Sequence, residues 1–489
     1  MTRGLLHSCL ALALLLTAAG WVPALAIEAG FAETDITPDV TSKRPVWLAG
    51  YRMGRRAKGI HDPLLCRSVV LKDGDERIAL VSVDLVGLQY PAVQQIRAKL
   101  AGFRYVMVSS THNHEGPDVI GIWGRTAFHR GVDDDYIALV VERVVQAVEK
   151  ASQSLAPVTA AYGTAEDESL LGDSRQPIVK DGVLRALRFD HVAGTLRVPS
   201  GGQGTRTVPA TAGLLVQWNC HPEALGSRNQ LVTADFPWAT VEWLKKKYNC
   251  PIVYMTGAVG GLMAPPRGGR IKDVGGNELH EGDYEYARVY GEEVAALAAK
   301  AVKAAQPIEL SPFVISARPI AVPLTNVLYR AARVAGVLQR EGLVWTGDFE
   351  QLGEPIVGDN ADRPTAVQSE VAYLRLGELH VACIPGEIYP ELVYGNYQEP
   401  VDPGADFPDA PLEPSIESLM PGPKWMLLGL ANDEVGYIIP KRQWDKAPPY
   451  AFGREQPQYG EINSCGPDVA PVLMEALKRR VAEATRGSK

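Results

Sequence analysis

His112 and His114 are the residues of this sequence whose types and spacing most favour chemistry. They follow the apolar run 105–110 and lie two positions apart, so both side chains can project from the same face at the end of a strand. One imidazole could bind a metal ion while the other lies beside a substrate. Histidines with a structural role are the alternative, and the spacing alone does not decide between the two.

Two further side chains suited to metal binding follow other expected strands. His221 comes after the apolar run 214–220, and Glu387 comes after the run 380–384 and a Pro-Gly break. In α/β folds, ligands and catalytic groups gather where strands end and loops begin. Two imidazoles and a carboxylate suit zinc with an open position for water. Whether these groups meet depends on the order of the strands, which the sequence leaves open.

A polar cluster at 431–437 contains other groups that could take part in chemistry, namely Asn432, Glu434 and Tyr437. Apolar residues flank the cluster on both sides. A turn that carries a buried tyrosine is the simpler interpretation of this pattern.

The signatures of several familiar mechanisms are absent from the sequence. It contains no GxSxG nucleophile elbow, no HExxH helix and no Walker loop. The glycine-rich run 257–261 follows an apolar stretch, but its spacing is not GxGxxG. We interpret it as a tight turn at the end of a strand, so a nucleotide-binding enzyme is the weakest functional alternative.

The elements that must position these residues alternate between strands and helices. Short apolar runs predict strands, and a period near 3.6 predicts helices. Strands are expected at 66–71, 77–84, 105–110, 159–164, 184–189, 212–220, 251–256, 312–323 and 371–385, and helices at 90–101, 134–153, 237–248, 284–305 and 467–485. This order predicts an α/β fold, a single large domain with mixed β-sheets flanked by helices. The segments 340–368 and 399–424 are expected to be long ordered loops.

The composition is that of a globular enzyme with a sizeable core. Of the 489 residues, 46% are hydrophobic and 22% are charged. These values exclude a disordered chain, a coiled coil and a collagen-like fibre. The net charge is -8, and no stretch interleaves Lys and Arg with aromatic residues, so we expect no nucleic-acid partner.

Residues 1–26 have the three parts of a secretory signal peptide. Arg3 precedes the apolar run 10–19, and Ala24-Leu25-Ala26 forms a small-x-small cleavage site. An uncleaved membrane anchor is the alternative. We expect cleavage near Ala26 and a secreted or periplasmic domain over 27–489.

The cysteines beyond the signal peptide are few and widely spaced. They can form at most two disulfides, so the fold should depend on its core rather than on cross-links. They are Cys66, Cys220, Cys250, Cys383 and Cys465.

The sequence resembles the neutral/alkaline, non-lysosomal ceramidase family in its catalytic domain. The most specific block is Thr-His-Asn-His-Glu-Gly-Pro at 111–117, and the similarity covers almost all of 27–489. Further matching segments are 30–38, 59–62, 81–84, 221–222, 384–387 and 431–437.

The resemblance implies a zinc amidase that cleaves ceramide into sphingosine and a fatty acid. Carried over position by position, it implies four zinc ligands: His112, His221, Glu387 and Tyr437. It places His114 beside the metal, against the substrate, and Arg175 matches the family's active-site arginine. In such a mechanism zinc lowers the pKa of a bound water toward about 7. The water attacks the amide carbonyl, and His114 or Arg175 stabilises the oxyanion.

Two features depart from the family. In ceramidases a Ser-Pro-Asn block follows a glycine-rich turn, and its serine is assigned a catalytic role. Here residues 260–265 are Gly-Gly-Leu-Met-Ala-Pro, without a serine. The family's carboxyl-terminal immunoglobulin-like domain is also not expected in this chain. Both departures concern the substrate rather than the metal ligands.

We therefore expect a zinc-dependent hydrolase that cleaves the amide bond of a ceramide-like N-acyl lipid through a metal-activated water. One alternative is an exported zinc hydrolase that acts on a different amide or ester. Another is a non-catalytic binding protein that retains the fold. The expected partners are a small lipid or N-acyl substrate and, transiently, a membrane or micelle surface. The oligomeric state is not predicted.

Overall fold

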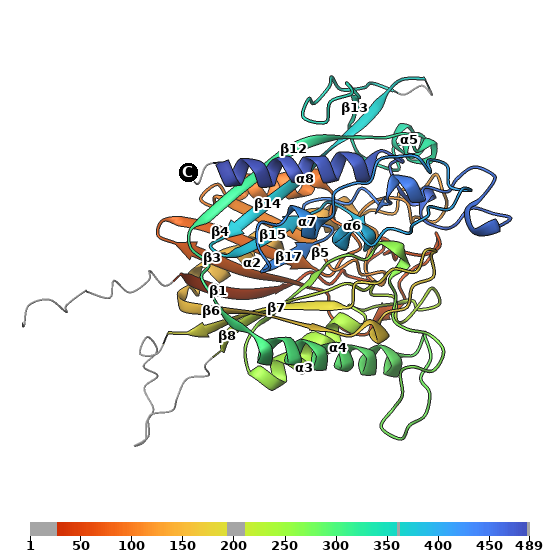
Figure 1. Ribbon diagram of the computed structural model, residues 1–489. Helices are drawn as coiled ribbons and strands as arrows, with labels where there is room; N and C mark the ends of the chain where they lie inside the picture. Colours follow the sequence, from red (N-terminus) through yellow and green to blue (C-terminus); the bar gives the residue numbers. More distant parts are fainter. Residues whose placement is uncertain (1–26, 193–210, 359–361, 487–489) are drawn as a thin grey trace, which may run out of the picture.

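The computed structural model describes residues 27–192, 211–358 and 362–486. In this part of the chain two β-sheets pack face to face, and helices cover the outer face of each sheet (Figure 1). Helix α8 (Val469–Arg486) covers the small sheet. The large sheet is covered by α1 (Tyr90–Lys99), α2 (Asp134–Gln153), α3 (Phe236–Tyr248) and α4 (Tyr284–Ala304). The α/β class expected from the sequence is confirmed.

The large sheet combines parallel and antiparallel strands. Its strands are β1 (Glu28–Asp35), β3 (Leu65–Asp73), β4 (Glu76–Val83), β5 (Tyr105–Ser110), β6 (Ala156–Glu166), β7 (Val183–His191), β8 (Thr211–Trp218), β10 (Ile252–Thr256) and β11 (Gln306–Ile308). They are ordered β10-β8-β7-β6-β1-β3-β4-β5, with β11 paired to β6. The pairs β4–β5 and β8–β10 are parallel, and the pairs between β8 and β4 are antiparallel. The sheet is therefore mixed, as the sequence predicts.

The small sheet lies over the inner face of the large one. Its strands are β12 (Phe313–Pro323), β13 (Gly342–Val344), β14 (Thr365–Leu376), β15 (Leu379–Cys383) and β17 (Trp425–Leu428). They are ordered β12-β14-β15-β17, with β13 paired to β14. Short ladders join β2 (Gly59–Ile60) to β9 (Leu231–Val232) and β16 (Glu387–Ile388) to β18 (Tyr437–Ile438). Short helices are α5 (Val327–Val334), α6 (Glu391–Tyr394) and α7 (Ile416–Leu419).

Alternating side chains explain the layers. Along β8, Leu215 packs in the core between the two sheets, whereas Leu214 and Val216 pack under α3 and α4. The pattern repeats in β4, where Leu80 lies between the sheets and Val81 lies toward α1 and α2. Successive side chains of a strand point to opposite faces, so a strand covered on both faces must be apolar on both. This explains why the sequence shows continuous apolar runs at these strands.

The expected elements are present, with three differences. The run 371–385, expected as one strand, is the end of β14 followed by β15, because a turn at Gly377 with a φ of +54° reverses the chain. Strand β1 is not among the expected elements, since the polar Glu28 and Glu33 interrupt its apolar pattern. The expected loops contain β13 and α7, so neither is without secondary structure.

The large sheet curls so that its end strands approach each other. β5 and β10 are in contact although they stand at opposite ends of the strand order. Residues 429–432, which we call the closing segment, lie between them. The amide of Gly429 donates to the carbonyl of Thr256 on β10, and the amide of Asn432 donates to the carbonyl of Val108 on β5. The closing segment thus joins the end of β17 to both ends of the large sheet.

Packing rather than cross-linking holds this fold together. Each cysteine in the described residues is free, which agrees with the expectation from the sequence: Cys66, Cys220, Cys250, Cys383 and Cys465. Among the helices described, none is long and apolar enough to cross a bilayer. The expected signal peptide, 1–26, lies outside the described residues.

We predict that Gly429→Ala destabilises the protein. A Cβ at this position would lie 2.2 Å from the carbonyl oxygen of Gly257, so the closing segment would have to move away from β10. Overpacking of this kind costs about 1–3 kcal/mol, which urea unfolding should record as a lower midpoint. Gly172→Ala is the matched control, because its Cβ would meet nothing closer than 3.4 Å. Equal stability of the two variants would contradict the role of the closing segment.

Candidate metal centre

His112 leaves β5 in a strained conformation that orients its ring. Its φ is +66°, in the left-handed region that residues with a Cβ seldom adopt. Such strain persists where the surrounding structure requires it, often at functional sites. The Nδ1 atom lies 2.6 Å from the carbonyl oxygen of Val86. Nδ1–H therefore donates to that oxygen, and Nε2 keeps its lone pair.

His221 is oriented in the same way by the glycine-rich turn. Its Nδ1 lies 2.9 Å from the carbonyl oxygen of Met263. The turn packs closely against β16, because a Cβ on Gly260 would lie 2.7 Å from the carbonyl oxygen of Glu387. Its glycines thus serve close packing, as expected of a tight turn, rather than phosphate binding. Metal-binding histidines usually donate their second ring N–H to such a carbonyl or to a carboxylate.

The carboxylate of Glu387 meets both imidazoles. Its Oε2 lies 3.2 Å from Nε2 of His112 and 3.0 Å from Nε2 of His221, and all three residues are buried. With both Nδ1 protons donated to carbonyls, the two Nε2 atoms and the carboxylate oxygen are all acceptors. Acceptors that converge in a dry interior are stable only when a cation or a proton lies between them.

The electrostatics of the space between His112, His221 and Glu387 favour positive charge. Burial would lower the pKa of His112, but the Glu387 carboxylate outweighs burial and raises it. Burial would likewise raise the pKa of Glu387, but His112 and His221 outweigh it and lower that pKa. The separations of 3.0 and 3.2 Å also fit zinc, because bonds of about 2.0–2.1 Å in a tetrahedron place ligand atoms about 3.3 Å apart. The three residues are suited to hold a divalent ion such as zinc.

Tyr437 lies next to Glu387 because β16 and β18 pair in parallel, with these two residues opposite each other. The ring centre of Tyr437 is 6.4 Å from that of His221. Burial, followed by the nearby carboxylate of Glu387, raises the pKa of the phenol well above its usual value. Without a cation beside it, Tyr437 therefore keeps its proton. Its part as a fourth ligand stays a prediction.

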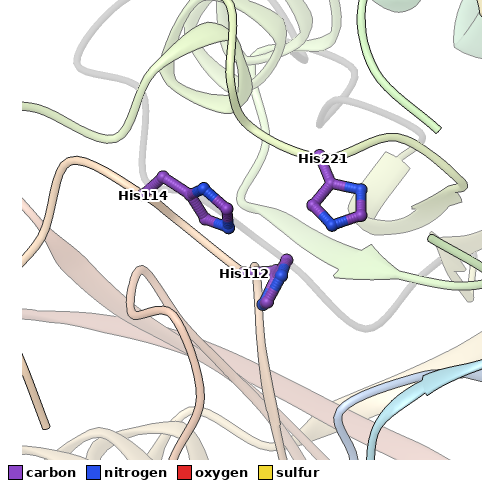
Figure 2. A group of neighbouring side chains, drawn as sticks. All are labelled: His112, His114 and His221. Atoms are coloured by element: carbon purple, nitrogen blue, oxygen red, sulfur yellow. The ribbon is translucent and has the colours of Figure 1, made fainter. Parts of the chain in front are cut away.

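His114 also faces His112 and His221. The rings of His112, His114 and His221 point toward one another (Figure 2), and one nitrogen of each lies within 4.8 Å of those of the others. His114 can therefore act as a third nitrogen ligand or as a base beside the ion. Burial lowers the pKa of the His114 imidazole to about 4, so the ring is neutral at neutral pH.

Arg175 is engaged elsewhere. Its guanidinium forms a buried, two-pronged ion pair with Glu461, at 2.7 and 2.9 Å, and donates to the carbonyl of Tyr459. It also lies over the ring of Tyr389. Tyr459 lines the cavity described next, whereas Arg175 does not. The arginine therefore supports the cavity wall from behind, and its expected contact with a substrate stays a prediction.

A cavity opens from the cluster. One part of its wall is polar and consists of His112, His114, Glu387 and Tyr437, together with Glu434. Another part is apolar and consists of Ile120, Ile122, Trp123, Leu324, Leu338 and Val367. The division of the wall suits a ligand that carries a hydrocarbon chain on a polar group.

One contributor lies outside the set expected from the sequence, and another, expected there, has a structural role. Oε1 of Glu223 lies 2.9 Å from Nδ1 of His114, and the only sequence signal for Glu223 is its position two residues after His221. Asn432 fixes the closing segment, since its side chain accepts from the amide of Val108 on β5 and donates to the carboxylate of Glu370 on β14. The polar cluster at 431–437 indicates Asn432 but not its partners.

Comparison with known proteins bears on the fold. No family model matches this sequence, and no curated protein matches it significantly. A solved structure of a neutral ceramidase from Pseudomonas aeruginosa is 17% identical, with a TM-score of 0.66, and the match covers 94% of this chain and 75% of that one. A ceramidase complexed with C2 is 16% identical, with a TM-score of 0.64, covering 95% of this chain and 76% of its own. At such identity the likeness shows a ceramidase-like fold.

We predict that the protein binds one zinc ion per chain and that His112→Ala abolishes this binding. The variant removes one of the two imidazoles that face Glu387, so the remaining donors cannot close the site. Elemental analysis after dialysis measures the zinc content. Zinc at about 1,000 times its dissociation constant should also stabilise the native state by about 4 kcal/mol, and a chelator should reverse the gain.

The control for this experiment is His61→Ala, because His61 does not line the cavity and should leave the zinc content unchanged. Full zinc content in the His112→Ala variant would contradict the proposed ligand set.

We predict that Arg175→Met destabilises the protein by about 3–5 kcal/mol, because it leaves the buried carboxylate of Glu461 without its partner. The double variant Arg175→Met/Glu461→Gln should recover much of the loss, since both charges are then removed. Urea unfolding measures both variants. A double variant that regains stability but has no hydrolytic activity would show that Arg175 acts on the substrate and not only on the wall.

Proposed function

We propose that this protein is a zinc-dependent hydrolase that cleaves an amide bond of a ceramide-like N-acyl lipid. The observation that carries the proposal is the convergence of acceptor atoms from His112, His221 and Glu387 at a cavity with a largely apolar wall. Such a site suits an amide at its polar end and a hydrocarbon chain along its apolar side. The ceramidases that share this fold support the same substrate class.

Zinc, when bound, supplies a Lewis acid that polarises the amide carbonyl and acidifies water. The chain itself supplies orientation and proton transfer. The carbonyls of Val86 and Met263 fix the two ligand rings, so little reorganisation is needed during the reaction. His114 is neutral and lies against the cluster, where it can take a proton from the attacking water and return it to the leaving amine.

The apolar part of the cavity is held in place by local hydrogen bonds. Asp118 accepts from the backbone amides of Ile120, Gly121 and Trp123, which fixes the loop that carries three of the apolar side chains. Each buried CH₂ group contributes about 0.8 kcal/mol to binding. A long acyl chain should therefore bind more tightly than an acetyl group.

A second candidate is an exported zinc hydrolase of a different amide or ester. The observation that favours it is the serine-free turn at 260–263, where Met263 uses its backbone carbonyl to orient His221. A non-catalytic binding protein is a weaker candidate, because it would not require the strained φ of His112. For either enzyme we infer from residues 1–26 a secreted or periplasmic location, where the protein meets lipid in a membrane or micelle.

Fatty-acid release from an N-acyl sphingosine in detergent micelles tests the proposal. We expect release by the zinc-loaded protein, loss of release with a chelator, and recovery when zinc is added back. Because burial of hydrocarbon favours binding, KM should fall from a two-carbon to a long acyl chain. The His112→Ala variant should be inactive on each substrate.

A soluble N-acyl amino acid and a soluble ester, assayed in parallel, separate the candidates. Hydrolysis of a soluble substrate without any release from N-acyl sphingosine would replace the lipid by the second candidate. Hydrolysis of none of them by a folded, zinc-loaded protein would overturn the assignment as an amidase or esterase.

A further inference from the structure

Exposed apolar side chains border the cavity. Three segments supply residues to its wall, namely 120–130, 326–338 and 459–463. Each of them also carries large apolar side chains that face solvent, among them Phe128, which is 87% exposed, and Tyr459 and Ile462, which are each 50% exposed. Single exposed apolar residues are common, whereas a group of them around one opening indicates an interaction surface.

Contacts between these three segments join them. The side chain of Asn326, at the start of α5, donates to the carbonyl of Ile462 at 2.8 Å. Beyond the end of α5, Val337 packs against the loop 120–130 so closely that a Cβ on Gly121 would overlap the carbonyl oxygen of Val337. Helix α5 is therefore attached at one end to the segment 459–463 and at the other to the loop 120–130.

A hairpin at 50–56 adjoins the same loop. Gly50 lines the cavity, and the amide of Gly54 donates to the carbonyl of Gly124 at 2.9 Å. The exposed Met53 lies next to Gly54. Four connected segments thus border the cavity, and together they form what we call the rim: 50–56, 120–130, 326–338 and 459–463.

Helix α5 contributes most of the exposed apolar surface of the rim. It contains no buried residue and lies at the edge of the molecule (Figure 1). Its side chains Val327, Leu328 and Val334 are 62%, 54% and 56% exposed. A surface helix of a globular protein normally turns its apolar side chains toward the core. Helices that lie in a lipid interface instead bury such side chains at the boundary between headgroups and acyl chains.

Exposed cations accompany these apolar residues. Arg52 and Arg56 of the hairpin and Arg125 of the loop are exposed, and within the described residues none of them forms an ion pair. The acidic residues 133–135, which follow the loop, are already paired with Arg44 and Arg130. The rim therefore presents positive charge without a partner, on a chain whose net charge is -8. Anionic lipid headgroups attract such cations.

We propose that the rim docks the mouth of the cavity onto an anionic lipid surface. Phe128, Val327 and Leu328 enter the boundary between headgroups and acyl chains, while the three arginines contact the anionic headgroups. For the proposed hydrolase, docking presents the cavity to N-acyl lipid held in the same surface. That consequence rests on the proposed function, whereas docking itself requires neither zinc nor turnover.

Co-sedimentation of the protein with lipid vesicles tests the docking without any substrate. We expect binding to vesicles that mix phosphatidylcholine with phosphatidylglycerol, and much weaker binding to phosphatidylcholine alone. Because salt screens charges at a surface, added NaCl should weaken the binding to the mixed vesicles.

Variants of the rim locate the surface that binds. Arg52→Gln/Arg125→Gln should weaken binding to the mixed vesicles by about fivefold for each cation removed. The matched control is Lys99→Gln/Lys150→Gln, which removes two exposed cations from α1 and α2, outside the rim, and should bind as the wild type does.

The apolar contribution is tested in the same assay. Phe128→Ser should weaken binding by about tenfold or more, because a large apolar side chain no longer leaves water. Val274→Ser is its control, since Val274 is fully exposed but lies outside the rim. All of these positions are at the surface, so urea unfolding should give midpoints equal to that of the wild type.

The outcomes separate the docking from the proposed function. Equal losses in the rim variants and their controls would overturn the rim as the docking surface, as would equal binding to both kinds of vesicle. Retention on heparin without binding to vesicles would assign the arginines to a soluble polyanion and also overturn the proposal. Hydrolysis of N-acyl sphingosine in micelles without binding to any vesicle would leave the proposed function and remove the docking. Rim-dependent binding by a protein that hydrolyses no substrate would do the reverse.

Discussion

Backbone hydrogen bonds from the closing segment, 429–432, to both ends of the curled sheet are the interactions on which the site depends. His112 follows β5 at one end of the strand order, and His221 follows β8, next to the other end. Tyr437 comes soon after the closing segment, and pairing of β16 with β18 sets Glu387 opposite it. The ligand candidates therefore meet only because β5 and β10 are held together. Strand pairing, rather than attraction among the side chains themselves, assembles the cluster.

Buried charges around the closing segment make this arrangement specific. Glu370 of β14 receives two hydrogen bonds from Arg97, each 2.8 Å, and a further one from Asn432. On the other side, the buried Asp433 is paired with the partly buried Arg340. A buried polar network is favourable only when every member is satisfied, so a shifted closing segment would leave charges unpaired. The same polar residues that look like a candidate site in the sequence thus serve to fix the path of the chain.

Much of the fold and part of the site could be predicted from the sequence, and the rest depends on tertiary contacts. Apolar runs locate the strands because both faces of the sheets are covered, and the groups that follow them, His112, His221 and Glu387, are found at strand ends. The curl of the sheet leaves no mark in local periodicity, so their meeting could not be predicted. Arg175 was expected to contact a substrate because it matches a family pattern. That pattern does not indicate the ion pair with Glu461, which holds the arginine behind the cavity. Glu223 belongs to no motif, and its contact with His114, at 2.9 Å, is known only from the structure.

The glycine-rich turn contains no serine, and this affects which group would act as the base in the proposed reaction. What the turn contributes to His221 is the carbonyl of Met263, a backbone group that any residue could supply. Gly260 is constrained, since a Cβ there would lie 2.4 Å from the ring of Tyr389, but the constraint excludes side chains and demands no hydroxyl. In the proposed hydrolysis, a turn without a serine offers no nucleophile of that kind, so water would attack the carbonyl and a nearby group would accept its proton. The neutral ring of His114, which lies against His112 and His221, is positioned to be that group in the proposed reaction.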